Sequence, residues 1–209
     1  HFASAVENAA DTTERLTLVS SGAITQGMAV DGGLAVDELA LQGGADVTFE
    51  NTGNQIGILA AGTSQKVLGS LSLVSNASLT VGTLGSQSGI SADGALSLSL
   101  ESGDLILDEA IAGADESITL ATHGGDIVAN AAITADGGAI SLSTAGGDLS
   151  VNEAISTQNA SEASLTVDVA EVIPTADGPG MATFEASVTT AGGQVYTGPV
   201  TYASGGALS

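Results

Sequence analysis

Three aspartates stand at a fixed spacing of 22 residues and form the chain's most regular set of charged ligands: Asp104, Asp126 and Asp148. Each follows a glycine at the start of a repeated segment that ends in Ala-Ile. Carboxylates one repeat apart could share a Ca²⁺ ion, which binds protein oxygens at about 2.3–2.6 Å. Calcium takes about six to eight oxygens, however, and one column supplies too few. Two interpretations stay open, a Ca²⁺ site and a row of solvent-exposed turn aspartates; no other cofactor is expected.

Four positions after each of these aspartates stands another polar residue, and together these residues form a second polar column: Asp108, Asn130 and Asn152. Amide and carboxyl side chains that stack at the strand spacing of about 4.8 Å can hydrogen-bond to one another along the stack. The sequence therefore predicts a structural ladder at a corner, without a chemical role.

Catalytic groups are scarce. Carbohydrate-cleaving enzymes use paired Asp or Glu side chains, commonly beside a basic group and aromatic sugar platforms, but the only basic residues are Arg15 and Lys66 and aromatics make up 2 %. Of the two histidines, His1 is terminal and His123 lies in a glycine-flanked turn. No Gly-x-Ser-x-Gly, His-Glu-x-x-His or phosphate-loop pattern occurs. The Thr-x-Thr pattern of flat ice-binding faces is missing too. We expect no enzyme.

The elements that carry these polar columns are short strands. In the repeated segment Leu105 and Leu107 alternate with Ile106, which is the two-residue period of a strand. Copies of one strand every 22 residues, bounded by Gly-Asp and Gly-Gly and with no helix between them, predict an all-β, parallel β-helix with coils of about 22–26 residues. Its predicted core stack comprises Leu105, Ile127 and Leu149, then Leu107, Ala129 and Val151, then Ile111, Ile133 and Ile155, and finally Leu98, Leu120 and Leu142.

The alternation of apolar residues and the composition divide the chain into three parts. Its 209 residues would hold roughly eight or nine coils, a body on the order of 40 Å long at the strand spacing. Residues 1–14 lack alternation and are expected to form an N-terminal segment or cap, and residues 15–160 the coils. The register slips after Ile155, so residues 158–161 are expected to be a turn insertion. Residues 161–209 hold all the prolines and both tyrosines, and predict wider coils or a closing element.

Charge narrows the possible partners. The chain carries 24 acidic and two basic residues, a formal net charge of −22. Such a surface repels nucleic acid and anionic lipid, because both need Lys or Arg to neutralise phosphate. Acidic charge also keeps a sheet-rich body soluble. No apolar run of 18 residues occurs, so we expect no membrane insertion. No cysteine is present, and the start at His1 suggests a piece excised from a longer protein.

The Gly-Gly-Asp strands, the Ala-Ile-Thr/Ser turns and the closing segment from Thr190 to Tyr202 resemble the β-helical shaft repeats of filamentous-haemagglutinin-type bacterial exoproteins. The resemblance covers most of residues 70–202. It implies a right-handed parallel β-helix, an extracellular or bacterial cell-surface location, and a role as a structural shaft segment of an adhesin or fibre. The partners that this reading implies are neighbouring coils, other copies joined end to end, and host or matrix glycans. The alternative is a carbohydrate-binding or carbohydrate-processing β-helix.

Overall fold

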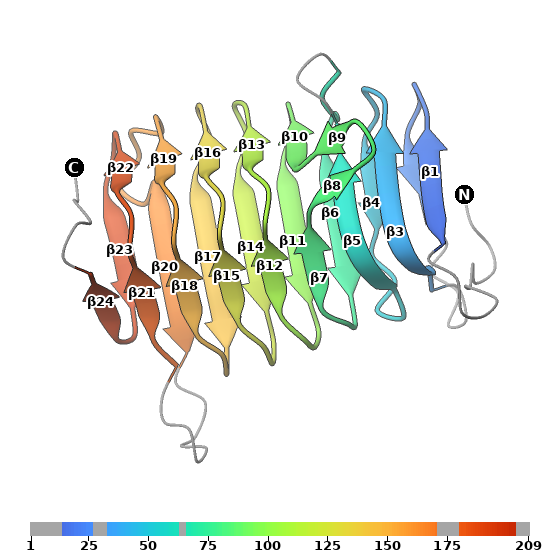
Figure 1. The fold of residues 1–209 in the computed structure, drawn as a ribbon. Helices are drawn as coiled ribbons and strands as arrows, with labels where there is room; N and C mark the ends of the chain where they lie inside the picture. Colours follow the sequence, from blue (N-terminus) through green and yellow to red (C-terminus); the bar gives the residue numbers. More distant parts are fainter. Residues whose placement is uncertain (1–13, 27–32, 63–65, 171–179, 204–209) are drawn as a thin grey trace.

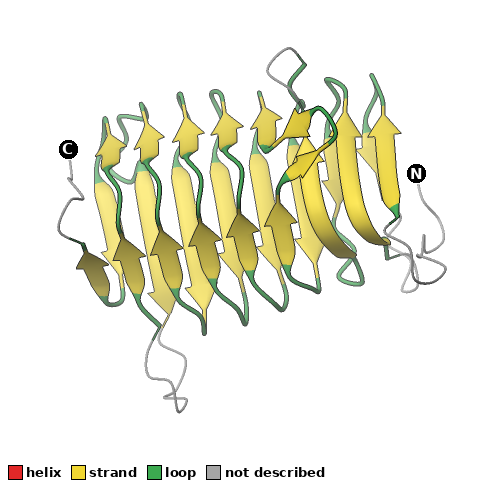
Figure 2. Cartoon of the chain, in the orientation of Figure 1, coloured by secondary structure: helices red, strands yellow, loops and turns green. Residues whose placement is uncertain are grey.

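The computed structural model describes residues 14–26, 33–62, 66–170 and 180–203. Throughout this part of the chain the regular structure is β-strand, and no helix occurs (Figure 2). The strands stack side by side into a parallel β-solenoid of eight coils (Figure 1). None of the described segments is a helix long and apolar enough to cross a membrane. The predicted all-β solenoid and its number of coils are thus confirmed.

One side of the solenoid, here called face A, is a single parallel sheet with one strand from every coil. Its strands are β2 (Ile24–Thr25), β4 (Val47–Phe49), β6 (Leu71–Ser75), β11 (Leu96–Leu100), β14 (Ile118–Thr122), β17 (Ile140–Ala145), β20 (Leu165–Ala170) and β23 (Gln194–Thr197).

A second sheet wraps around the other two sides, faces B and C. Face B consists of β7 (Leu79–Val81), β12 (Leu105–Leu107), β15 (Ile127–Ala129), β18 (Leu149–Val151), β21 (Ala182–Phe184) and β24 (Val200–Tyr202). Face C consists of β10 (Ile90–Ala92), β13 (Ile111–Gly113), β16 (Ile133–Ala135), β19 (Ile155–Thr157) and β22 (Val188–Thr190). In the first coils one strand serves both faces: β1 (Arg15–Val19), β3 (Ala35–Gln42) and β5 (Gln55–Ala61).

Each coil is counted from face B through face C to face A, so coil 1 is β1–β2, coil 4 runs from β7 to β11 and coil 5 from β12 to β14. From coil 4 to coil 7 the strands repeat in the predicted register. Leu105 pairs with Ile127, and Ile127 pairs with Leu149, one coil apart in each case. Every pairing between coils is parallel, because each coil runs in the same direction as the one before it.

The core is a set of aliphatic columns along the axis. Leu105, Ile127 and Leu149 are at most 1 % exposed, whereas Ile106 and Val128 between them are only partly buried. Burial of each such side chain contributes about 1.5–3 kcal/mol, and every one touches a like residue above and below. The remaining predicted columns are buried in the same way: Leu107, Ala129 and Val151; Ile111, Ile133 and Ile155; Leu98, Leu120 and Leu142.

The alternation of buried and exposed residues is reset on face B, in the first half of β3 and of β5. Val36 and Leu39 are both buried although they are three residues apart, and so are Ile56 and Leu59. Ile56 and Ile58 have the two-residue spacing of a strand, but only Ile56 lies in the core. Ile58 pairs with Thr80, the outward residue of β7, so its side chain joins an apolar cluster outside the core.

A buried amide pair joins the first three coils at one corner, and it was not predicted from the sequence. Gln26 Nε2 donates to Asn54 Oδ1 at 2.6 Å, and Asn54 Nδ2 donates back to Gln26 Oε1 at 3.0 Å. Asn54 also accepts the Leu34 N–H and donates to the Val74 carbonyl. Amides buried at this depth need such partners, since an unpaired one costs about 1–3 kcal/mol.

The predicted insertion at residues 158–161 is confirmed by the register. Ile140 pairs with Leu165, 25 residues on, where earlier coils need 22. The extra residues form a turn in which Asn159 donates to the Gly137 carbonyl at 2.7 Å. Beyond it, β20 to β24 continue the same sheets, so the described part of residues 161–209 is further coils. The segment expected at residues 1–14 lies outside the described residues, Glu14 excepted.

The core stack predicts a sharp contrast between two neighbouring substitutions. Ile127→Asp places an unpaired carboxylate between two apolar coils and is expected to cost more than about 4 kcal/mol. Ser150→Asp changes a side chain on the outer side of β18 and is expected to cost less than about 1 kcal/mol. Thermal unfolding monitored by circular dichroism measures the loss of stability in each variant. Equal losses of stability would contradict the assignment of inner and outer positions.

Candidate functional site

The three aspartates 22 residues apart lie at the turns that lead from face A to face B. Asp104 Oδ1 accepts the backbone N–H of Asp126 at 2.9 Å, and Asp126 Oδ1 accepts that of Asp148 at 2.8 Å. Asp148 Oδ1 in turn accepts the N–H of Met181 at 2.8 Å. Each carboxylate therefore supports the turn of the next coil, which is the role of an Asx-type cap extended between coils.

The glycine before each aspartate is required by the same stacking. A Cβ atom at Gly125 would collide with the Gly103 backbone and with the Asp104 carboxylate, and Gly147 stands in the same position against Gly125 and Asp126. A glycine lets consecutive turns approach closely enough for the carboxylate to reach the next N–H. This close approach accounts for the repeated Gly-Asp pair.

The structure does not gather these aspartates into a calcium site. They are spread along the axis, one to each coil, and one oxygen of each already accepts a backbone N–H. Within the described ranges no group of three or more His, Asp or Glu side chains could hold a metal ion. The geometry therefore favours the alternative interpretation, in which these residues cap turns.

The polar column at the corner between faces B and C forms the expected contacts. Asn130 Nδ2 donates to Asp108 Oδ1 at 3.0 Å, and Asn152 Nδ2 donates to Asn130 Oδ1 at 2.8 Å. All three side chains are exposed, so the bonds run along the outside of the corner. They tie together the edges of coils 5, 6 and 7.

His123 is placed as a turn residue. Its ring Nδ1 lies 3.2 Å from the Leu100 carbonyl oxygen, one coil back, and its own N–H donates to that carbonyl at 2.8 Å. The side chain is exposed, and its ring contacts this backbone oxygen. This environment supplies neither an orienting carboxylate nor a nucleophile for general-base chemistry.

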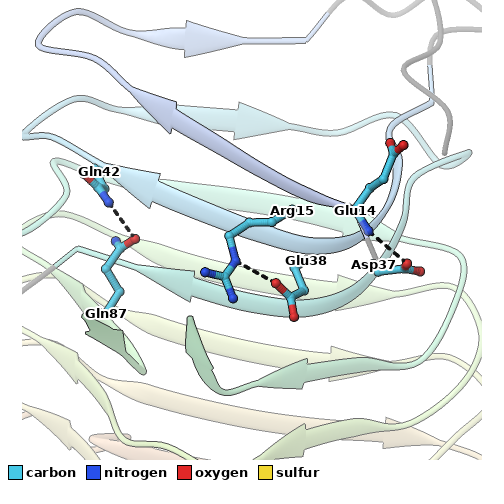
Figure 3. Close-up of polar contacts among 6 residues, drawn as sticks. All are labelled: Glu14, Arg15, Asp37, Glu38, Gln42 and Gln87. Atoms are coloured by element: carbon cyan, nitrogen blue, oxygen red, sulfur yellow. Dashed lines mark hydrogen bonds and ion pairs between the residues drawn. The ribbon is translucent and has the colours of Figure 1, made fainter. Parts of the chain in front are cut away.

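The most irregular part of the surface lies over the first coils. There the two short strands β8 (Thr83–Leu84) and β9 (Gln87–Ser88) form an antiparallel hairpin, which the sequence did not predict. Arg15 Nε contacts Glu38 Oε2 at 2.6 Å nearby, and the Glu14 N–H donates to Asp37 (Figure 3). Arg15 is one of only two basic residues in the chain, and it is paired.

A shallow pocket of about 270 Å³ opens on the side of the same coils. It lies where the first residues of β5 have no strand of β7 beside them. Its polar lining comes from Asp37, Gln55 and Ser78. The other lining residues are Ala35, Val36, Ile56, Gly57 and Ala77. The pocket offers a carboxyl, an amide and a hydroxyl group, which are hydrogen-bonding groups suited to a small polar ligand.

A column of hydroxyl groups runs along the outer side of face A, and it was missed in the sequence. Seven successive coils place a Ser or Thr at the same outward position, each paired with the next: Thr25, Thr48, Ser72, Ser97, Thr119, Ser141 and Thr166. Ser97, Thr119 and Ser141 keep the 22-residue spacing of the repeat, whereas Thr25, Thr48, Ser72 and Thr166 do not. Strand pairing brings these other members into the same line.

The last coils end in an aromatic cluster. The rings of Phe184 and Tyr202 stack with centroids 5.1 Å apart, and Tyr196 meets both of them edge-on. Tyr196 donates its hydroxyl to Gln194 Oε1 at 2.7 Å. Burial, helped by the neighbouring Tyr202 hydroxyl, raises the pKa of Tyr196 well above its usual value, so this phenol stays protonated at physiological pH.

No protein-family model, curated protein or solved structure matches this chain. The class that its geometry defines is an all-β parallel β-solenoid with coils of about 22 residues.

The corner ladder predicts that Asp108→Asn is tolerated or stabilising. The amide oxygen of the new side chain can still accept from Asn130, and the substitution removes one of the 24 acidic groups. We expect the free energy of unfolding to change by less than about 0.5 kcal/mol. Asp108→Ala is the control, expected to cost about 0.5–1.5 kcal/mol because it deletes the acceptor. A clear loss in the Asn variant would show that the carboxylate has a specific role.

The turn aspartates predict a loss that does not depend on calcium. Asp126→Ala removes the acceptor of the Asp148 N–H and is expected to cost about 1–2 kcal/mol. Melting of the unchanged protein and of this variant should be unaffected by chelator, and titration calorimetry with Ca²⁺ should give no binding heat. A chelator-sensitive melting temperature that becomes insensitive in Asp126→Ala would instead establish a metal site.

Proposed function

We propose that this chain is a structural shaft segment of a secreted bacterial adhesin or extracellular fibre, located outside the cell or on the bacterial surface. One observation carries the proposal: the polar side chains that recur from coil to coil bind the next coil instead of converging on a common point. The Asp104 and Asp108 columns both do so. Repeated polar side chains that bind the next coil stabilise the stack along its axis, as a shaft requires, and they do not come together as a set of catalytic groups.

The proposal also takes support from the resemblance of residues 70–202 to the shaft repeats of filamentous-haemagglutinin-type exoproteins. The uniform acidic surface is compatible with an exposed fibre, since net charge of one sign discourages lateral aggregation of sheets. Catalysis is not part of this function.

The partner that we propose for the shaft is another set of coils stacked end to end. In the described part of the chain, the apolar residues that pack on the core but stay only partly buried all belong to the end coils: Leu16, Leu18, Ile24, Tyr196, Val200 and Tyr202. Each coil in the interior of the solenoid has its core residues covered on both sides. Coils added beyond either end would complete this burial.

End-to-end stacking predicts a salt-dependent assembly. The charge of −22 opposes association at low ionic strength, so added salt should promote filaments by screening it. Light scattering and negative-stain microscopy at low and high salt, with and without Ca²⁺, follow the process. Leu18→Glu adds a charge to an end coil and is expected to abolish association, whereas the matched Ser150→Glu adds it to the side of the shaft and is not.

Two results would count against the stacking. A particle that stays monomeric under every condition would reject self-assembly of this chain. Equal effects of Leu18→Glu and Ser150→Glu would show that any association uses the sides of the shaft and not its ends.

A second candidate function, carbohydrate binding, is favoured by the pocket at Asp37, Gln55 and Ser78. Its volume of about 270 Å³ suits one sugar ring, and host or matrix glycans are the corresponding partners. The lining lacks an aromatic platform, so the binding would rest on hydrogen bonds. A glycan array with the unchanged protein and with Gln55→Ala distinguishes the two functions, because a pure shaft retains no glycan in either form.

A further inference from the structure

Solenoids have a characteristic weakness at their ends. Each coil contacts only the coils directly before and after it, so the stability of the stack is a sum of neighbouring interfaces. An end coil has one interface instead of two and opens more readily than the interior. In this chain the hairpin β8–β9 makes a contact of a different kind.

The hairpin belongs to coil 4 but lies on the outer surface of coils 2 and 3. Residues 82–89 leave the solenoid between β7 and β10 and fold back over β3 and β5 (Figure 1). Leu84 is only 4 % exposed and packs with Ala40 of β3 and Ala60 of β5, with Ile58 at the edge of the cluster. This small apolar cluster is separate from the main core, and it explains why Ile58 points outward.

The second contact is a buried amide that reaches back two coils. Gln87 is 1 % exposed, and its Nε2 donates to the Leu41 carbonyl of coil 2 at 2.6 Å, across 46 residues of sequence. Its Oε1 accepts from Gln42 Nε2 at 3.2 Å (Figure 3). Gln87 Nε2 also donates to the Gly62 carbonyl of coil 3 at 3.4 Å, so one side chain of coil 4 binds both coil 2 and coil 3.

The base of the hairpin is fixed on its own coil and the next. Gly89 has a φ of 71°, and any Cβ there would collide with the Ala110 carbonyl, so the turn back into β10 requires glycine. Thr83 Oγ1 lies 2.8 Å from Glu109 Oε1 and 3.0 Å from Ser88 Oγ. Hydrogen bonds from the Ser88 and Thr83 hydroxyls lower the pKa of Glu109, so its carboxylate stays charged to a lower pH in the folded protein than in the unfolded chain. This stabilisation is complete above the unfolded pKa and is lost as the pH falls through the folded pKa.

We propose that residues 82–89 act as a strap that clamps coil 4 to coil 2 and makes the first coils open together with coil 4 instead of one by one. The tip of the hairpin lies near coil 1, because a Cβ atom added at Gly85 would stand 3.6 Å from the Arg15 guanidinium. Arg15 is held in place by its ion pair with Glu38 of coil 2. Four successive coils are thereby linked on their outer surface, in addition to the core contacts between neighbours.

In later coils a short connection stands at the corner between faces B and C, where coil 4 has the hairpin. Val151 and Ile155 of coil 7 are joined by the three residues Asn152, Glu153 and Ala154, whereas Val81 and Ile90 of coil 4 are joined by the hairpin. A variant in which Asn-Glu-Ala replaces residues 82–89 therefore keeps the solenoid path and deletes the strap alone. This design uses a corner that the same chain already forms.

Native-state hydrogen exchange tests the strap. In the unchanged protein, amides of β1, β3 and β7 should share one opening free energy and one dependence on denaturant. In the Asn-Glu-Ala variant, exchange of β1 and β3 should become at least about tenfold faster while that of β15 and β18 stays the same. Gln87→Ala should give the same pattern to a smaller degree, and it provides the test if the shortened variant does not fold.

The matched control is Val128→Ala, which trims a partly buried outer residue of β15 far from the hairpin. It should leave exchange of β1 and β3 unchanged. Unaltered exchange of β1 and β3 in both strap variants would overturn the proposal. A uniform rise in all coils would overturn it as well, because that pattern is ordinary global destabilisation without a specific link between coils 4 and 2.

Discussion

Parallel stacking of one coil on the next, at the strand spacing of about 4.8 Å, is the constraint on which everything else in this molecule depends. A coil of about 22 residues has no core of its own. Its inward side chains, such as Ile127, are buried because Leu105 and Leu149 lie directly below and above. The same register fixes the partners of outward and turn residues. Core, turns and surface columns therefore share one period.

Polar side chains serve this stacking in two ways. At the turns, a carboxylate caps a backbone N–H of the following coil, and at the corner, amides bond to one another. The turn aspartates stand on the outside in a regular row, and they contribute to the high negative charge of the chain. In the described coils, this organisation repeats one simple pattern of surface groups from coil to coil, as the proposed shaft would require.

The first coils depart from this regularity, and the departures occur together. Long strands turn the corner between faces B and C, Ile58 points outward, and a hairpin from coil 4 covers the resulting apolar cluster. The buried pair of Gln26 and Asn54 lies in the same coils. These first coils are thus linked by a hairpin and by buried amides, in addition to the strand pairing that they share with the regular coils.

The sequence by itself determined the strand period, the inward and outward residues of coils 4 to 7, the insertion after Ile155 and the ladder at Asp108, Asn130 and Asn152. It could do so because residues a constant 22 positions apart must become neighbours in a parallel stack. Tertiary structure alone decided the extension of the hydroxyl column on face A to Thr25, Thr48 and Thr166, the outward turn of Ile58 and the bond from Gln87 to Leu41. Those features join residues at unequal separations, so only the pairing of the folded strands specifies which side chains meet.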